Sequence, residues 1–172
     1  MVEPNRYWHD LYASLRPGDN FLECAVSPER GEGKMFWFSD LASSNTLSKD
    51  FAKRISESQN VPIGNEITVD LITLSDSIDI HRERFSELPT LISIDVEGID
   101  YEIMKAYDFS TRPLFFMIED PDIDGSFNEG KLRKLLRNVD YRPVSHNLLT
   151  TLFVDSTTPE SRALLEIGPR NL

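Results

Sequence analysis

Apolar residues recur at helical spacing in several stretches of the chain. Trp8, Leu11 and Leu15 form one apolar stripe over Arg6–Leu15, and a proline–glycine pair follows directly. This pattern predicts a helix that ends before the pair. The same reasoning predicts four further helices, over Ser48–Ser58, Ser75–Phe85, Tyr101–Tyr107 and Glu129–Val139. Ser48 is of a residue type that caps helix N-termini.

Short runs of β-branched, aromatic and aliphatic residues separate these helices. They predict five strands, at Phe21–Ser27, Lys34–Phe38, Ile67–Leu74, Leu91–Val96 and Leu114–Ile118. A hairpin is predicted within Tyr141–Asp155, and its second strand is Leu149–Val154. A turn rich in glycine and charge, Pro28–Gly33, lies between the first two strands.

Two of the strands are apolar on both faces. Leu91–Val96 and Leu114–Ile118 have this character, and a helix is predicted after each. Strands buried on both faces belong in the middle of a sheet that helices cover. We therefore predict an α/β fold with a mainly parallel sheet and a C-terminal antiparallel hairpin.

The length and the lack of repeats predict one domain. The 172 residues contain no linker long enough to divide them. We assign residues 1–155 to the domain and residues 156–172 to a C-terminal surface helix or tail.

Composition excludes several classes of function. Acidic residues outnumber basic ones by 29 to 18, for a net charge of −11, which argues against a nucleic-acid partner. No stretch is long and apolar enough to span a membrane, and Met1–Arg16 lacks a signal-peptide core. We expect a cytoplasmic protein. The single cysteine, Cys24, allows neither an internal disulfide nor a multi-cysteine zinc site.

Acidic residues follow the two apolar strands. Asp95 and Glu97 lie at the end of the first, and Glu119 and Asp120 follow the second. In open α/β sheets, ligands bind outside the carboxyl ends of the strands. These acids therefore predict a ligand-binding edge, and the alternative is that they cap the helices that follow.

The sequence LISIDVEGIDYEIM at Leu91–Met104 resembles the signature of the FkbM-type methyltransferase family. Other segments resemble family features in the same order, namely Val2–Asn5, Cys24–Ser27, Ser43–Leu47, Thr68–Leu74 and Leu114–Glu119. The resemblance implies a Rossmann-like methyltransferase sheet, S-adenosylmethionine as cofactor, and methyl transfer to a hydroxyl oxygen of a small molecule or a sugar.

The resemblance also implies roles for particular residues. Glu3 matches the acid that accepts hydrogen bonds from the cofactor's ribose, the alternative being a surface acid. Ala25 and Val26 match the adenine side of the site, with core packing as their alternative. Asp95 matches the acid beside the methionine end of the cofactor, where it binds the ammonium group or orients the acceptor hydroxyl.

Catalysis of transfer to a hydroxyl needs a base, for which Asp95 and His146 are candidates. A lone histidine is more often structural. Hard oxygen ligands from Asp95, Glu119 and Asp120 suggest Mg²⁺ as a further cofactor. Gly98 fits a tight turn into the next helix.

The resemblance departs from the family pattern in one respect. The family has a glycine-bearing loop of the type DxGxNxG between its first strand and first helix, and this sequence shows none. We therefore expect the sheet to lack its first β-α unit and to expose an apolar edge. Three explanations stay open: Met1 is not the true start, the chain is a fragment, or the sheet closes in another way, such as by forming a homodimer.

Two rival functions stay open. One is an inactive family member that acts by assembly. The other is a calcium-binding module at residues 120–125, where acids alternate and a glycine follows. The twelfth position of that loop is Lys131 and lacks the bidentate glutamate.

Overall fold

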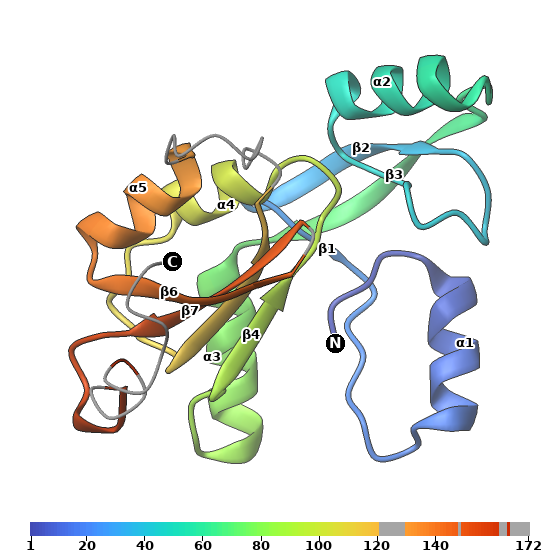
Figure 1. The fold of residues 1–172 in the computed structure, drawn as a ribbon. Coiled ribbons are helices and arrows are strands. Elements are labelled where there is room, and N and C mark those ends of the chain that lie inside the picture. The colour runs from blue at the N-terminus through green and yellow to red at the C-terminus, as the bar shows by residue number, and fades with distance from the viewer. Residues whose placement is uncertain (121–129, 148, 162–164, 166–172) are drawn as a thin grey trace. The chain divides into compact units, whose positions relative to one another are not determined.

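The computed structural model describes residues 1–120, 130–147, 149–161 and 165 (Figure 1). The chain divides into two compact units, and each contains its own sheet. The first unit comprises Met1–Ser77 and Val96–Ala106. The second unit comprises Ile78–Asp95 and Tyr107–Leu172.

The first unit holds a three-stranded sheet in the order β1-β3-β2. Its strands are β1 (Ala25–Val26), β2 (Gly31–Trp37) and β3 (Asn65–Ile72), and its helices are α1 (Arg6–Leu15), α2 (Lys49–Gln59) and α4 (Asp100–Ala106). Strand β1 runs parallel to β3, whereas β2 pairs antiparallel with β3. The core of this sheet is formed by Ala25, Met35 and Val69.

Side chains cap both early helices as their sequences favour. Asn5 caps α1, and its Oδ1 accepts a hydrogen bond from Tyr7 N at 3.0 Å. The predicted cap of α2 is confirmed, because Ser48 Oγ accepts from Phe51 N at 3.2 Å. Helix α2 ends at Asn60 in the left-handed conformation, with φ 54°, a position where asparagine costs little.

One strand prediction in the first unit, and the turn prediction that follows it, are wrong in extent. Of the predicted strand Phe21–Ser27, only Ala25 and Val26 belong to β1, and Leu22 forms an isolated bridge with Val2. The predicted turn Pro28–Gly33 ends early, because β2 already begins at Gly31.

The glycines of β2 explain the second error. A Cβ at Gly33 would lie 2.9 Å from Leu71 Cδ1 on the paired strand. Glycine lets the Leu71 side chain pack closely over this strand, although it resembles a turn residue in the sequence.

Helix α3 (Leu74–Phe85) begins with a reciprocal cap. Asp76 N donates to Thr73 Oγ1 at 3.1 Å, and Thr73 N donates to Asp76 Oδ2 at 2.9 Å. This pair satisfies backbone donors that the first helical turn leaves open. It fixes the point at which β3 gives way to the helix.

The second unit holds a four-stranded sheet in the order β4-β5-β7-β6. Its elements are β4 (Leu91–Ile94), β5 (Phe115–Glu119), α5 (Lys131–Asn138), β6 (Tyr141–Asn147) and β7 (Thr150–Asp155). Strands β4 and β5 are parallel, and β5–β7 and β6–β7 are antiparallel. The predicted C-terminal hairpin is confirmed.

The prediction of a mainly parallel sheet is wrong. Among the named strands of the described residues, two pairings are parallel and three are antiparallel. The prediction that Leu91–Val96 is buried on both faces also fails. Strand β4 lies at the end of the sheet order, and Leu91 is 47% exposed. Apolar composition alone cannot distinguish an end strand from a central one.

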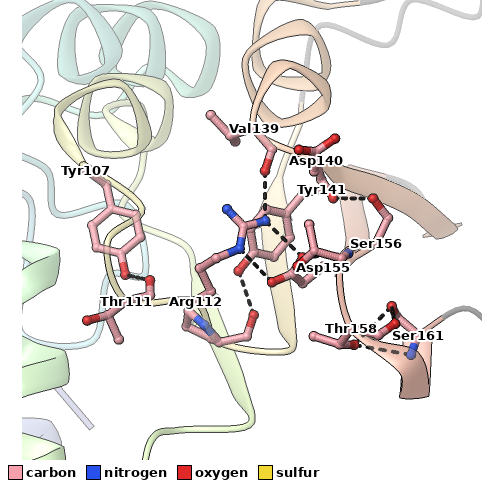
Figure 2. A network of polar contacts seen from close by, with 12 residues as sticks. Tyr107, Thr111, Arg112, Val139, Asp140, Tyr141, Asp155, Ser156, Thr158 and Ser161 are labelled. Carbon is pink, nitrogen blue, oxygen red and sulfur yellow. Dashed lines mark hydrogen bonds and ion pairs between the residues drawn. The ribbon is translucent and has the colours of Figure 1, made fainter.

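A buried aromatic cluster fills the second unit, and a polar network lies beside it (Figure 2). Phe116, Tyr141 and Phe153 are fully buried. Arg112 donates two hydrogen bonds to Asp155, at 2.7 and 2.9 Å, and its guanidinium stacks 4.8 Å above the Tyr141 ring. The network ties the segment before β5 to the end of β7.

Among the described residues, no helix is long and apolar enough to cross a membrane. The predicted helix or tail at residues 156–172 lies largely outside the described residues, as do positions 121–125 of the suggested calcium loop.

Candidate functional site

The carboxyl ends of β4 and β5 bring two acidic side chains together. Ile94 pairs with Ile118, so the next residues, Asp95 and Glu119, lie side by side. Carboxylate oxygens of these two acids lie within 4.8 Å of each other. The prediction that the two strands deliver acids to one common edge is confirmed.

Two neighbouring carboxylates create a local site for positive charge. Like charges at this separation repel, and an ammonium group or a metal ion between them removes that repulsion. Each carboxylate also offers two acceptor oxygens to ligand N–H or O–H groups. Asp95 and Glu119 can therefore hold a cationic group, a hydroxyl or a metal ion.

Asp120, the third predicted metal ligand, has a partner within the protein. Its side chain is 1% exposed and pairs with Arg133 Nε at 3.0 Å. Its backbone N–H donates to Leu149 O at 2.6 Å. A buried carboxylate that is already paired with a guanidinium is poorly suited to bind a metal ion. We therefore assign Asp120 a structural role beside the acid pair.

His146 lies two strands away from β5 at the same edge of the sheet. It pairs with Thr151 of β7, which in turn pairs with Ile118 of β5. The imidazole Nδ1 lies 2.9 Å from Thr151 Oγ1. Side chains alternate between faces along a strand, so His146 and Glu119, one row apart, point to opposite faces.

Hydrogen bonds to the carboxylate of Asp100 stabilise the turn between β4 and α4. Asp100, which is 6% exposed, accepts hydrogen bonds from Val96 N and Gly98 N, both at 3.3 Å. Gly98 has φ +102°, which confirms the predicted tight turn. Thr46 Oγ1, also buried, donates to Glu97 O at 2.6 Å. These contacts fix the backbone directly after Asp95.

Glu3 is tied to its own segment at the start of the chain. Its Oε1 accepts from Asn5 N at 2.7 Å. Burial raises the pKa of Glu3, while the hydrogen bond from Asn5 acts in the opposite direction. Its neighbours Pro4 and Asn5 line a cavity of about 750 Å³, together with Trp37 and several acidic residues. The ribose-binding role of Glu3 stays a prediction.

Ala25 and Val26 differ in their surroundings. Ala25 is 5% exposed and packs with Met35 and Val69 in the core. Val26 is half-buried and pairs with Ile72. Of the two readings open for Ala25, core packing describes its side chain.

Sequence reasoning missed Arg133, Thr151 and Asp100. Thr151 carried no signal that distinguishes it from its neighbour Thr150 in the same strand. Asp100 lies two residues after the IDVEG motif, in the first turn of α4, a position where acids stabilise helices. Arg133 carried no signal in the sequence, since a basic residue on an amphipathic helix is usually exposed.

A mixed α/β fold with acids at the carboxyl ends of neighbouring parallel strands is compatible with the methyltransferase-like class of α/β proteins. The family profile described as Methyltransferase FkbM domain matches residues 1–143, and the chain belongs to this family. No curated protein matches the sequence, and no solved structure does.

Proposed function

We propose that this protein uses S-adenosylmethionine to methylate a hydroxyl oxygen of a small molecule or a sugar. Membership of the family supports methyl transfer. The observation that carries the site assignment is the meeting of Asp95 and Glu119 within 4.8 Å at one edge of the sheet.

The acid pair suits the charges of this cofactor. S-adenosylmethionine supplies an electrophilic methyl group on a sulfonium, and its methionine end carries an ammonium group. Asp95 would hold that ammonium by accepting hydrogen bonds from it, in a charge-assisted contact stronger than a neutral one. Glu119 adds a second negative charge to the same edge.

Asp95 can also serve the acceptor. When the acceptor hydroxyl donates a hydrogen bond to the Asp95 carboxylate, a lone pair of the hydroxyl oxygen is free to face the methyl group. Positioning of this kind supplies much of the rate gain in a bimolecular displacement. The carboxylate would take the hydroxyl proton as the new C–O bond forms and the sulfur–methyl bond of the cofactor breaks, which leaves a neutral thioether.

Mg²⁺ is the second use that the acid pair allows. Hard cations prefer carboxylate oxygens and usually retain several waters. Asp95 and Glu119 would be protein ligands of the ion, because their carboxylate oxygens lie within 4.8 Å of each other. If Mg²⁺ is required, a chelator abolishes methyl transfer and Mg²⁺ restores it.

A transfer assay tests the function. The full chain is incubated with methyl-labelled S-adenosylmethionine and a panel of sugars and hydroxylated small molecules. We expect label in at least one acceptor, and Asp95→Asn to lower kcat by about 10²–10⁴-fold, the contribution of a positioned base. Glu83→Gln, on the exposed face of α3, is the control and retains the wild-type rate.

Two results would count against the proposal. Label that reaches no acceptor in the panel would favour the family member that acts by assembly. If the Asp95→Asn variant transfers the label as well as the wild type does, the reaction does not take place at this edge of the sheet.

A further inference from the structure

We propose that Thr151 is a positioning residue that, with Arg133, fixes the neutral imidazole of His146 in the tautomer protonated on Nε2. His146 would then donate a hydrogen bond at the carboxyl edge of the sheet and could not accept a proton there. Its part in methyl transfer rests on the proposed function, whereas its tautomer does not.

Three side chains from different elements meet at one buried oxygen. Thr151 is fully buried, and its Oγ1 lies 2.9 Å from His146 Nδ1 and 3.3 Å from Arg133 Nη2. The guanidinium of Arg133 is held in turn by Asp120, which is 1% exposed. Each of these contacts lies within the second unit.

The hydrogen atoms can be assigned by counting donors. A guanidinium only donates, so Arg133 occupies a lone pair of Thr151 Oγ1. The buried hydroxyl still needs an acceptor for its own hydrogen. Among its contacts in the described residues, His146 Nδ1 is the atom that can accept.

The other tautomer conflicts with this arrangement. With a proton on Nδ1, His146 and Arg133 would both donate to Thr151 Oγ1. The hydroxyl hydrogen of this buried side chain would then have no acceptor among its contacts in the described part of the chain, which carries the cost of an unmade hydrogen bond. The neutral imidazole therefore has a bare Nδ1 and a proton on Nε2.

This assignment changes what His146 can do. Its imidazole is half-buried, one row from Glu119 and on the opposite face of the sheet. A protonated Nε2 suits a ligand oxygen with a lone pair, such as a hydroxyl, a carbonyl or a carboxylate. It does not suit a general base, so the base role stays with Asp95.

Nitrogen-15 NMR of the full chain reads the tautomer directly. Long-range ¹H–¹⁵N correlations distinguish protonated from bare ring nitrogens, at a pH where titration of the same signals shows all imidazoles to be neutral. His146→Gln assigns the signals by their loss. In the wild type we expect the tautomer protonated on Nε2 to be about tenfold or more as populated as the one protonated on Nδ1, because one buried hydrogen bond favours it.

Variants at Thr151 separate positioning from packing. Thr151→Val keeps the shape but removes the hydroxyl, and should bring the tautomer ratio close to that of a free imidazole. Thr151→Ser restores the hydroxyl and should restore the wild-type ratio. His9 is the internal control, since its Nε2 contacts the carbonyl oxygen of Glu3, independently of Thr151.

A wild-type protein with Nδ1–H as its main form would overturn the proposal. So would a folded Thr151→Val variant with an unchanged ratio. The spectra need neither cofactor nor acceptor, so this test can fail while methyl transfer is observed. Equally, the tautomer can be as stated in a protein that transfers no methyl group.

Discussion

Asp155 shows how one carboxylate can hold several segments of the second unit. It is 1% exposed and receives both hydrogen bonds from Arg112 as well as two from Thr157 (Figure 2). Burial alone would raise the pKa of Asp155, but the hydrogen bonds from Arg112 and Thr157 outweigh it and lower the pKa. The charged form is therefore the stable one.

Replacing Asp155 with asparagine should strongly destabilise the protein. The change leaves the Arg112 charge half-buried without its partner, which costs about 3 kcal/mol. Urea denaturation measures this loss. Asp140→Asn is the matched control, because Asp140 is 61% exposed and lies 3.6 Å from Arg142. We expect the control to change stability by less than about 0.5 kcal/mol. Equal losses in the two variants would contradict the argument.

The carboxylate of Asp76 should make the stability of the fold depend on pH in the acid range. Hydrogen bonds from Arg30 are the largest cause that lowers its pKa, to about 2. A lowered pKa stabilises the fold above the unfolded value, about 3.9, and this contribution disappears as the pH falls through the folded value. Because Arg30 is 75% exposed and solvent screens the pair, we expect a contribution of about 1 kcal/mol or less.

Comparison with Asp76→Asn isolates that contribution. The stability difference between wild type and variant should be constant above about pH 5 and vanish between about pH 4 and pH 2. Urea denaturation at a series of pH values measures it. A difference that persists unchanged at pH 2 would show that the carboxylate charge is not the cause.

At the scale of elements, Gly98 governs the entry into α4. Its φ is +102°, and a Cβ there would lie 2.9 Å from Phe51 Cβ. Gly98→Ala should therefore cost about 2 kcal/mol or more, from both strain and overlap. Gly18→Ala is the control, since a Cβ there meets nothing within 4 Å. Thermal unfolding compares the two variants, and equal melting temperatures would rule out this role.

Helices were the elements that the sequence predicted best. Arg6–Leu15 has the predicted bounds, and Ser48 caps α2 as expected. Helical spacing and caps are local signals, so they survive without knowledge of the rest of the fold. Strand limits depend on partners instead. Leu22 is apolar like Ala25, yet it forms an isolated bridge while Ala25 lies in β1.

The site was predictable in part, because some of its residues follow from local sequence patterns. Asp95 and Glu119 each follow an apolar run, and parallel pairing brings such ends together. The contact between Asp120 and Arg133 could not be predicted, because their approach depends on how α5 packs on the sheet. The direction of the β5–β7 pairing, which makes the sheet mixed, was likewise absent from the composition.

At the scale of the whole molecule, the net charge of −11 has a consequence for the site. A negatively charged protein attracts a cationic cofactor, and salt screens that attraction. The acceptor, the cytoplasmic location and a homodimer stay predictions.

Calorimetric titration of the full chain with S-adenosylmethionine tests the account most directly. We expect saturable binding that Asp95→Asn weakens by about tenfold or more, since a charge-assisted hydrogen bond contributes about 1.5–3 kcal/mol. Asp10→Asn, an exposed change on α1, should bind like the wild type. Wild-type protein that binds no S-adenosylmethionine, or Asp95→Asn protein that binds it equally well, would contradict the account.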